Sequence, residues 1–156
     1  MSMERARAWL ERYGVADRIQ EFTESSATVE LAAQRLNVEP ARIAKSLSFK
    51  TEGSVILIIA AGDVKVDNSK YKALFHTKAK MLKADEVEPL IGHGVGGVCP
   101  FGVNEGVAVY LDESLKRFST VFPAVGTAAS AIELTPEELE RVACPVAWVD
   151  VCKSTG

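Results

Sequence analysis

Apolar residues in the first part of the chain recur at helical spacing. Positions 9, 10 and 13 share one face of a predicted helix that Gly14 ends. Positions 29, 32, 33 and 36 form the i, i+3, i+4, i+7 stripe of a second helix. Ser26 or Thr28 is expected to cap this helix, because a hydroxyl oxygen can accept a hydrogen bond from a free backbone N–H. Core packing is the simplest purpose of both apolar faces.

The pattern becomes that of strands after Pro40, which is expected to open a short helical turn. Residues 45–51 alternate, with Leu47 and Phe49 on one side and polar residues on the other. Residues 54–61 are almost wholly apolar, which is typical of a strand covered on both faces. Glu52-Gly53 separates the two segments. We therefore expect a hairpin whose second strand lies at the centre of a sheet.

Helix and strand signals alternate over the rest of the chain. Asp67 is expected to cap a helix that reaches Leu74, and Asp85 another that reaches Ile91. Further strands are predicted at 107–111, 120–122, 131–134 and 146–151. Residues 135–138 read Thr-Pro-Glu-Glu, which combines a capping box with proline at the first helical position and predicts a helix start.

These elements indicate a single α+β domain over residues 1–156, with a mixed or antiparallel sheet that curls toward a barrel and short helices around it. The chain has 156 residues, 47% of them apolar and 25% charged, which is enough to bury a core unaided. Its apolar runs fall short of the roughly 20 residues that span a bilayer. The first residues also lack the apolar core of a signal peptide. We therefore expect a cytoplasmic protein with no membrane partner.

The cysteine and histidine content argues against a disulfide framework and against a metal site. Cys99, Cys144 and Cys152 are odd in number and follow no paired spacing, so reduced thiols are expected. His76 and His93 are 17 positions apart, and no ligand cluster surrounds either in the sequence. The prediction is a protein without metal or other cofactor, in which both histidines occupy turns or the surface.

Charge is unevenly distributed along the chain. The formal net charge is −3, yet six lysines lie between positions 65 and 83 with only Asp67 to oppose them. Acidic residues gather at 85–88 and 133–140. A solvated lysine face is one interpretation, and a surface that contacts nucleic-acid phosphates is the other. In either case the basic and the acidic residues are expected on different parts of the surface, so that a polyanion would bind on the basic side.

Glycine is concentrated between residues 92 and 102, where five glycines precede or surround the sequence Cys99-Pro100. Glycine permits positive φ and lets another molecule approach the backbone closely, while proline stiffens the turn. A glycine-rich turn between strands is the simpler interpretation of this segment alone. The alternative is a recognition site built from backbone groups.

Several short segments, taken in order, resemble the YbaK/EbsC family. They are Ala44-Lys45-Ser46-Leu47, Ala60-Ala61-Gly62-Asp63, Gly96-Gly97-Val98-Cys99-Pro100-Phe101-Gly102, and Gly126 followed by Ile132-Glu133-Leu134. This family contains aminoacyl-tRNA deacylases related to the editing domain of bacterial prolyl-tRNA synthetase. The similarity runs from about the second predicted helix to the last strand. No single segment is specific, but the ordered set is.

The resemblance implies a trans-editing hydrolase that cleaves the ester of a mischarged aminoacyl-tRNA, most simply tRNA(Pro), with prolyl-tRNA synthetase as a second partner. Editing of this kind is needed because a binding pocket gains only ~1–3 kcal/mol of discrimination per methylene. The catalytic candidates that follow are Lys45, whose ammonium would bind substrate or polarise the ester, and the backbone of Gly96 and Gly97, which would hold the carbonyl oxygen or the attacking water.

Further residues are candidates for the site, from the resemblance, from the lysine-rich segment and from the end of the predicted central strand. The substrate-binding candidates are Asp63, Val98, Cys99, Pro100, Gly126 and Ser130, and the tRNA-binding candidates are Lys65 and Lys70. Asp63 could instead be an ordinary turn residue. Lys70 is expected at a helix start, where backbone N–H groups favour phosphate.

The sequence departs from the Cys-tRNA-specific members of the family in one segment. Residues 126–130 read Gly-Thr-Ala-Ala-Ser where a Gly-Lys-Arg-Gly-like run is expected, so two basic residues are absent. Cys99 also stands where some relatives carry serine. The amino acid removed is therefore left open between alanine and cysteine.

Two alternatives compete with this hypothesis. Cys99 could act as a nucleophile activated by His93, six residues earlier, although a small buried thiol is the commoner role of cysteine. The chain could also be a non-catalytic module that binds aminoacyl-tRNA or a nucleotide, or that docks on a synthetase. Turnover at substoichiometric protein would separate an enzyme from a binding module.

Overall fold

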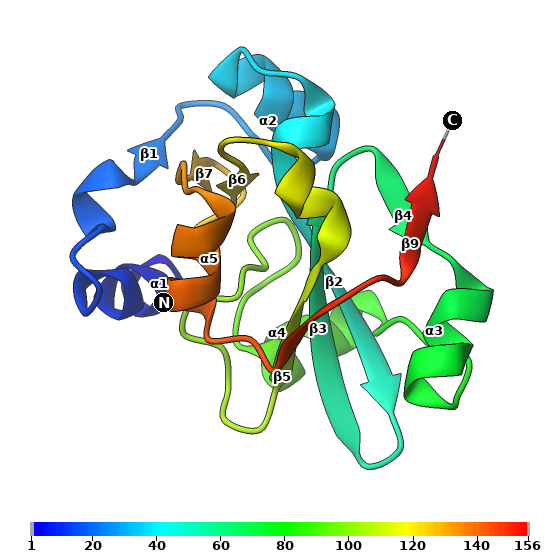
Figure 1. The fold of residues 1–156 in the computed structure, drawn as a ribbon. Helices are drawn as coiled ribbons and strands as arrows, with labels where there is room; N and C mark the ends of the chain where they lie inside the picture. The colour runs from blue at the N-terminus through cyan, green and yellow to red at the C-terminus, as the bar shows by residue number, and fades with distance from the viewer. Residues whose placement is uncertain (1, 156) are drawn as a thin grey trace.

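The computed structural model describes residues 2–155 and shows a central sheet surrounded by short helices (Figure 1). The α-helices are α1 (Ser2–Glu11), α2 (Val29–Leu36), α3 (Asn68–Phe75), α4 (Ala84–Ile91) and α5 (Pro136–Ala143). The 3-10 helices are η1 (Ala16–Arg18), η2 (Pro40–Arg42) and η3 (Glu113–Arg117). The strands are β1 (Gln20–Glu21), β2 (Ile43–Thr51), β3 (Ser54–Ala61), β4 (Val64–Val66), β5 (Ala108–Asp112), β6 (Phe122–Pro123), β7 (Ser130–Ala131), β8 (Ala147–Val149) and β9 (Cys152–Ser154).

The main sheet has five strands in the order β6-β2-β3-β5-β8 and is mixed. The hairpin β2–β3 is antiparallel, and Lys45 lies opposite Ala60 in its register. The pairs β2–β6, β3–β5 and β5–β8 are parallel. Two smaller antiparallel pairs, β1–β7 and β4–β9, lie beside this sheet. The predicted α+β class with a curled, mixed sheet is confirmed (Figure 1).

The core is built around β3, whose residues 56–61 are all buried. Because side chains alternate along a strand, both faces of β3 must be covered. On one face, Phe49 of β2 contacts Tyr71 of α3 at a ring-centroid distance of 5.2 Å. Helices α1 and α5 pack together elsewhere on the core, where the Trp9 indole N–H donates to the Val142 carbonyl over 2.6 Å. The central position expected for this strand is confirmed.

Most helix starts follow their sequence signals. The Thr28 hydroxyl caps α2, the Asp67 carboxylate caps α3, and Thr135 forms a capping box with Glu138 at α5. The prediction that Asp85 caps α4 is wrong. Lys83 is the N-cap residue and Asp85 lies in the first turn, where the Glu86 carboxylate accepts the Lys83 N–H instead.

The C-terminal strand prediction is also wrong in one respect. Residues 146–151 were expected to form one strand, but β8 ends at Val149 and the chain then turns into β9. At the separation, the buried carboxylate of Asp112 accepts the N–H of Val151 over 3.0 Å between the two strands, a contact between residues 39 positions apart. Among residues 2–155, no helix is both long and apolar enough to cross a membrane.

Candidate functional site

A cavity of about 380 Å³ opens beside the first half of β2. Its walls come from β2, from the segment before α2, from the glycine loop after α4 and from the segment around β7. The wall includes Lys45, Ser46 and Ser48 of β2, Gly96 and Val98 of the glycine loop, and Ser130 of β7. Segments that are far apart in sequence therefore meet here, as the resemblance implied for Lys45 and the glycine loop.

Lys45 is half-buried near the start of β2, and its ammonium donates a hydrogen bond to the backbone carbonyl of Val64. Burial lowers the pKa of Lys45, and the carboxylates of Asp63 and Glu30 partly oppose this shift. One of the three ammonium N–H groups is thus held by the protein, which leaves two for a ligand. The start of β4 therefore orients the Lys45 side chain, next to the turn that follows β3.

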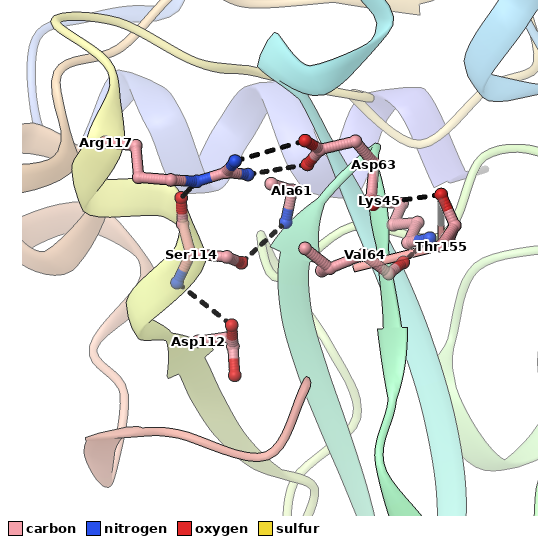
Figure 2. Close-up of polar contacts among 8 residues, drawn as sticks. All are labelled: Lys45, Ala61, Asp63, Val64, Asp112, Ser114, Arg117 and Thr155. Carbon is pink, nitrogen blue, oxygen red and sulfur yellow. Dashed lines mark hydrogen bonds and ion pairs between the residues drawn. The ribbon is translucent and has the colours of Figure 1, made fainter. Parts of the chain in front are cut away.

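That turn is held by a residue that the sequence analysis did not identify, Arg117 of η3. Its guanidinium makes two hydrogen bonds to the Asp63 carboxylate, at 2.5 and 3.1 Å, and its Nε donates to the Ser114 carbonyl over 2.9 Å (Figure 2). These bonds lower the pKa of Asp63. Asp63 lies outside the walls of the cavity, so its role here is to pair with Arg117 beside the carbonyl that holds Lys45.

A chain of hydrogen bonds continues from this ion pair into the core (Figure 2). The Ser114 hydroxyl accepts the N–H of Ala61 over 3.1 Å, and the Ser114 N–H donates to the Asp112 carboxylate over 3.0 Å. On the other side, the Asp63 carbonyl accepts both the N–H and the hydroxyl of Thr155, each at 3.1 Å. The end of β3 and the following turn are therefore fixed from two directions.

The glycine loop forms a tight turn at residues 94–97. The N–H of Gly97 donates to the carbonyl of Gly94 over 3.0 Å, and Gly96 has a φ of +92°, which favours glycine. The N–H of Gly97 is therefore occupied within the protein. By contrast, the N–H groups of Gly96 and Val98 have no acceptor among residues 2–155, and both residues line the cavity.

Gly97 contributes through close packing. A Cβ at this position would lie 2.6 Å from the carbonyl carbon of Gly126 and 2.6 Å from the nitrogen of Thr127. Only a residue without a side chain lets the two glycine segments touch. Gly126 has a φ of +78° and lies outside the cavity wall. The buried Ser130 hydroxyl accepts the N–H of Val125 over 3.0 Å and shapes the same segment from within the wall.

Cys99 and Pro100 are buried and lie outside the cavity wall. Burial raises the pKa of Cys99 to about 12, and its thiol donates to the Phe101 carbonyl at 3.7 Å. His93 is fully buried in the bend after α4 and bonds the same carbonyl through Nε2 at 2.6 Å, so the alternative of a surface position is wrong for this residue. A thiol that stays protonated does not serve as a nucleophile at neutral pH. His76, by contrast, is exposed at the end of α3.

The two tRNA-binding candidates differ in availability. The Lys70 ammonium is held by the Asp150 carboxylate at 3.0 Å and by the Cys152 carbonyl at 2.9 Å. Lys65 is exposed and lines a second cavity of about 290 Å³, which shares Lys45 and Met81 with the first. Within residues 2–155, no group of three or more His, Cys, Asp or Glu side chains is arranged to hold a metal ion.

Some of the site could not be read from the chain. Ser46 and Ser48 line the cavity, and the alternation with Leu47 was the signal that placed them on its side of β2. Met81 and Arg117 carried no such signal. Arg117 lies 54 positions from Asp63, and an exposed arginine after a helical turn resembles any other surface cation.

Comparison with known proteins identifies the family. The model of the aminoacyl-tRNA editing domain matches residues 23–142. The uncharacterized protein YwhH of Bacillus subtilis (strain 168) is 53% identical over 154 residues, which is 98% of each chain. Proline--tRNA ligase of Geobacillus sp. (strain WCH70) is 30% identical over 95 residues, which is 60% of this chain and 17% of the ligase.

A solved structure extends the match to the whole fold. A candidate trans-editing enzyme for prolyl tRNA synthetase superposes with a TM-score of 0.87 at 30% identity, covering 98% of both chains. The similarity therefore extends over nearly the whole chain, including the sheet and the glycine loop. The chain belongs to the aminoacyl-tRNA editing domain family.

Proposed function

We propose that this protein is a cytoplasmic deacylase that removes a wrongly attached amino acid from tRNA, with Ala- or Cys-tRNA(Pro) as substrate and prolyl-tRNA synthetase as a partner. Its family supports this proposal, as do the relatives named for proline--tRNA ligase and for trans-editing. Turnover distinguishes this activity from simple binding of the same tRNA.

The observation that carries the proposal is that one cavity joins Lys45 with the unpaired N–H groups of Gly96 and Val98. In ester hydrolysis, the oxygen of water bonds to the acyl carbon and the bond from that carbon to the ribose oxygen breaks. A proton from water ends on the ribose oxygen. Negative charge develops on the carbonyl oxygen during this step, and a preorganised ammonium and backbone N–H groups stabilise such charge.

Water is the proposed nucleophile. Cys99 is protonated, buried and outside the cavity wall. The hydroxyl of Ser130 is already engaged with Val125 and with the carbonyl of Thr127. The lysine beside the cavity acts as a cation in this scheme, since an ammonium is the form that polarises a carbonyl.

The lining of the cavity supports an uncharged amino acid such as alanine or cysteine. Ala44 and Val98 supply short apolar surface, while Ser26, Ser46 and Ser48 supply hydroxyl groups. Such a wall of apolar and hydroxyl groups accommodates a methyl or thiol group more readily than a charged side chain. This chemistry is the reason for proposing alanine or cysteine as the amino acid that is removed from the tRNA.

The test is deacylation of Ala-, Cys-, Ser- and correctly charged Pro-tRNA(Pro) by wild type and by Lys45→Met. Methionine keeps an apolar stem of similar length and removes the charge. We expect the variant to lose ~100- to 1000-fold in kcat, the range seen when one oxyanion-stabilising group is removed. Hydrolysis of no ester above the protein-free rate would refute the proposal.

Lys50→Met is the matched control, because Lys50 lies on the same strand, pairs with Glu86 and lines neither cavity. It should keep wild-type activity. The pH profile gives a second readout. Burial lowers the pKa of Lys45, so the active ammonium is lost as pH rises through that lowered value. After subtraction of spontaneous hydrolysis, the alkaline decline should begin below the ordinary lysine pKa of 10.5 and be absent in Lys45→Met.

A further inference from the structure

The second cavity lies on the face of β2 opposite Ser46 and Ser48. Lys45, Leu47 and Phe49 share that face by strand alternation, and all three line the cavity. Its volume of about 290 Å³ is near the lower end of small-molecule pockets, which begin at ~300 Å³. Because Lys45 and Met81 belong to the walls of both cavities, the two spaces adjoin at the candidate catalytic lysine.

Positive charge is concentrated at the edge of this cavity without matching carboxylates. Lys65 of β4 lies directly opposite Lys153 of β9, and both are exposed. Like charges at directly opposed positions destabilise a strand pair. No carboxylate among residues 2–155 pairs with Lys65, whereas Lys70 is neutralised by Asp150. Lys153 is one of the groups that lower the pKa of the nearby Asp67. The Asp67 carboxylate, however, already accepts backbone N–H groups as the cap of α3.

The cavity also offers groups suited to a nucleobase. The Asn68 side chain is exposed and forms no hydrogen bond within residues 2–155. A carboxamide supplies a donor and an acceptor side by side, the pattern that pairs with N7 and the N6 amino group of adenine. Met81 is 59% exposed, and a backbone bridge to Phe49 fixes it beside β2. An exposed thioether next to Leu47 and Phe49 forms an apolar wall for a flat ring.

We propose that this cavity binds the 3′-terminal adenosine of the tRNA, with its base between Met81 and Asn68 and its 5′-phosphate at Lys65 and Lys153. The inference rests on the proposed function. It places Lys45 between the base and the aminoacyl group, beside the ester that joins the amino acid to the ribose. The phosphate offsets the repulsion between the two opposed lysines.

The first experiment measures binding without catalysis. Adenosine 5′-monophosphate is titrated into protein labelled with ¹³C at methionine methyl groups, and ribose 5-phosphate serves as the ligand without a base. We expect the monophosphate and uncharged tRNA to shift the Met81 resonance, assigned with Met81→Leu, and ribose 5-phosphate to leave it in place. Asn68→Ala and Lys65→Ala should each weaken monophosphate binding about tenfold.

The second experiment measures deacylation by the same variants. Asn68→Ala and Lys65→Ala should raise KM for the mischarged tRNA about tenfold, with kcat within about twofold of wild type. Lys116→Ala, which removes the same charge and lines neither cavity, should leave both unchanged.

The outcomes separate the two proposals. Normal deacylation with an unmoved Met81 resonance and unchanged KM in both variants would overturn the adenosine site while leaving the proposed function intact. A Met81 shift with the monophosphate alone, unmatched by tRNA and without deacylation, would identify a free-nucleotide site and overturn the tRNA assignment. A shift with both ligands and a raised KM supports the inference.

Discussion

At the scale of single residues, the two glycines at the end of the tight turn have different physical tasks. Gly96 supplies a positive φ, and Gly97 supplies the absence of a side chain where two backbone segments touch. Neither task needs a side-chain group to take part in the chemistry. A glycine-rich segment therefore identifies the site by what it allows the backbone to do.

Gly97→Ala should destabilise the fold, because its Cβ would lie 2.6 Å from backbone atoms of Gly126 and Thr127. We expect a loss of about 1–3 kcal/mol in the free energy of unfolding, as for other overpacked positions, together with reduced deacylation. Gly94→Ala is the control, since the nearest atom to its Cβ is a Glu88 carboxylate oxygen at 3.5 Å. It should change stability by under about 0.5 kcal/mol in urea denaturation. Equal stability of the two variants would contradict the packing role of Gly97.

Some of the site residues could be predicted from the sequence and others could not. Lys45 and the glycine segment were found because their neighbours match a family pattern, and the structure places both at one cavity. Arg117 was not found, because its importance comes from a partner 54 positions away. The burial of His93 was not predicted, because nothing local distinguishes a buried histidine in a loop from an exposed one. Long-range contacts leave no trace in local pattern, so such residues require the fold.

At the scale of elements, the turn between β3 and β4 connects η3 to the lysine. The Arg117 guanidinium holds Asp63 through two bonds, and the next residue, Val64, holds the Lys45 ammonium (Figure 2). Both partners of the ion pair are more than a third exposed, so the pair contributes little to global stability, about 0–1 kcal/mol. Its proposed effect is on the position of Lys45.

Arg117→Gln should therefore lower kcat by about 10- to 100-fold while changing the free energy of unfolding by less than about 1 kcal/mol. Arg117→Lys should restore activity only in part, because an ammonium cannot form the paired bonds of a guanidinium. Lys116→Gln, one residue earlier, controls for loss of a charge. Deacylation kinetics and urea denaturation measure the two quantities. Wild-type kcat in Arg117→Gln would rule out the positioning role.

The contribution of the Arg117–Asp63 ion pair to stability should depend on pH in the acid range. The bonds from Arg117 lower the pKa of Asp63 in the folded state below its ordinary value of 3.8. The pair's contribution to stability is then present above that ordinary pKa and is lost as pH falls through the lowered one. Any stability difference between wild type and Arg117→Gln should accordingly persist at neutral pH and disappear in strong acid.

Elements whose signals are local were predicted well, and those that depend on partners were not. Capping groups fixed the starts of α2, α3 and α5 from a few adjacent residues. The break between β8 and β9 depends on Asp112, 39 positions before Val151, which no local pattern contains. The mixed sheet order likewise depends on pairings between distant strands.

At the scale of the whole molecule, the net charge of −3 conceals an uneven distribution of charge along the chain. The basic segment runs through β4 and α3, and the acidic residues of 137–140 lie on α5, on the opposite side of the molecule in Figure 1. Lys65 lines the second cavity, and Lys72 and Lys78 line a neighbouring one that shares Asn68 with it. A tRNA that places its 3′ end in the site would therefore pass over the basic face.

Salt should weaken tRNA binding in proportion to the phosphates contacted on that face. With three to four contacts at ~0.7–0.9 each, log Kd should rise with log salt at a slope of about 2–3.5. The inactive Lys45→Met protein allows this measurement by fluorescence anisotropy of labelled tRNA at ~50 and ~200 mM salt. Lys72→Gln with Lys78→Gln should lower the slope by ~1.4–1.8, because two contacts are lost, whereas Lys116→Gln should not. If the double substitution leaves the slope unchanged, the tRNA binds elsewhere on the protein. The reason is that counterion release reports only the charged side chains that contact the nucleic acid.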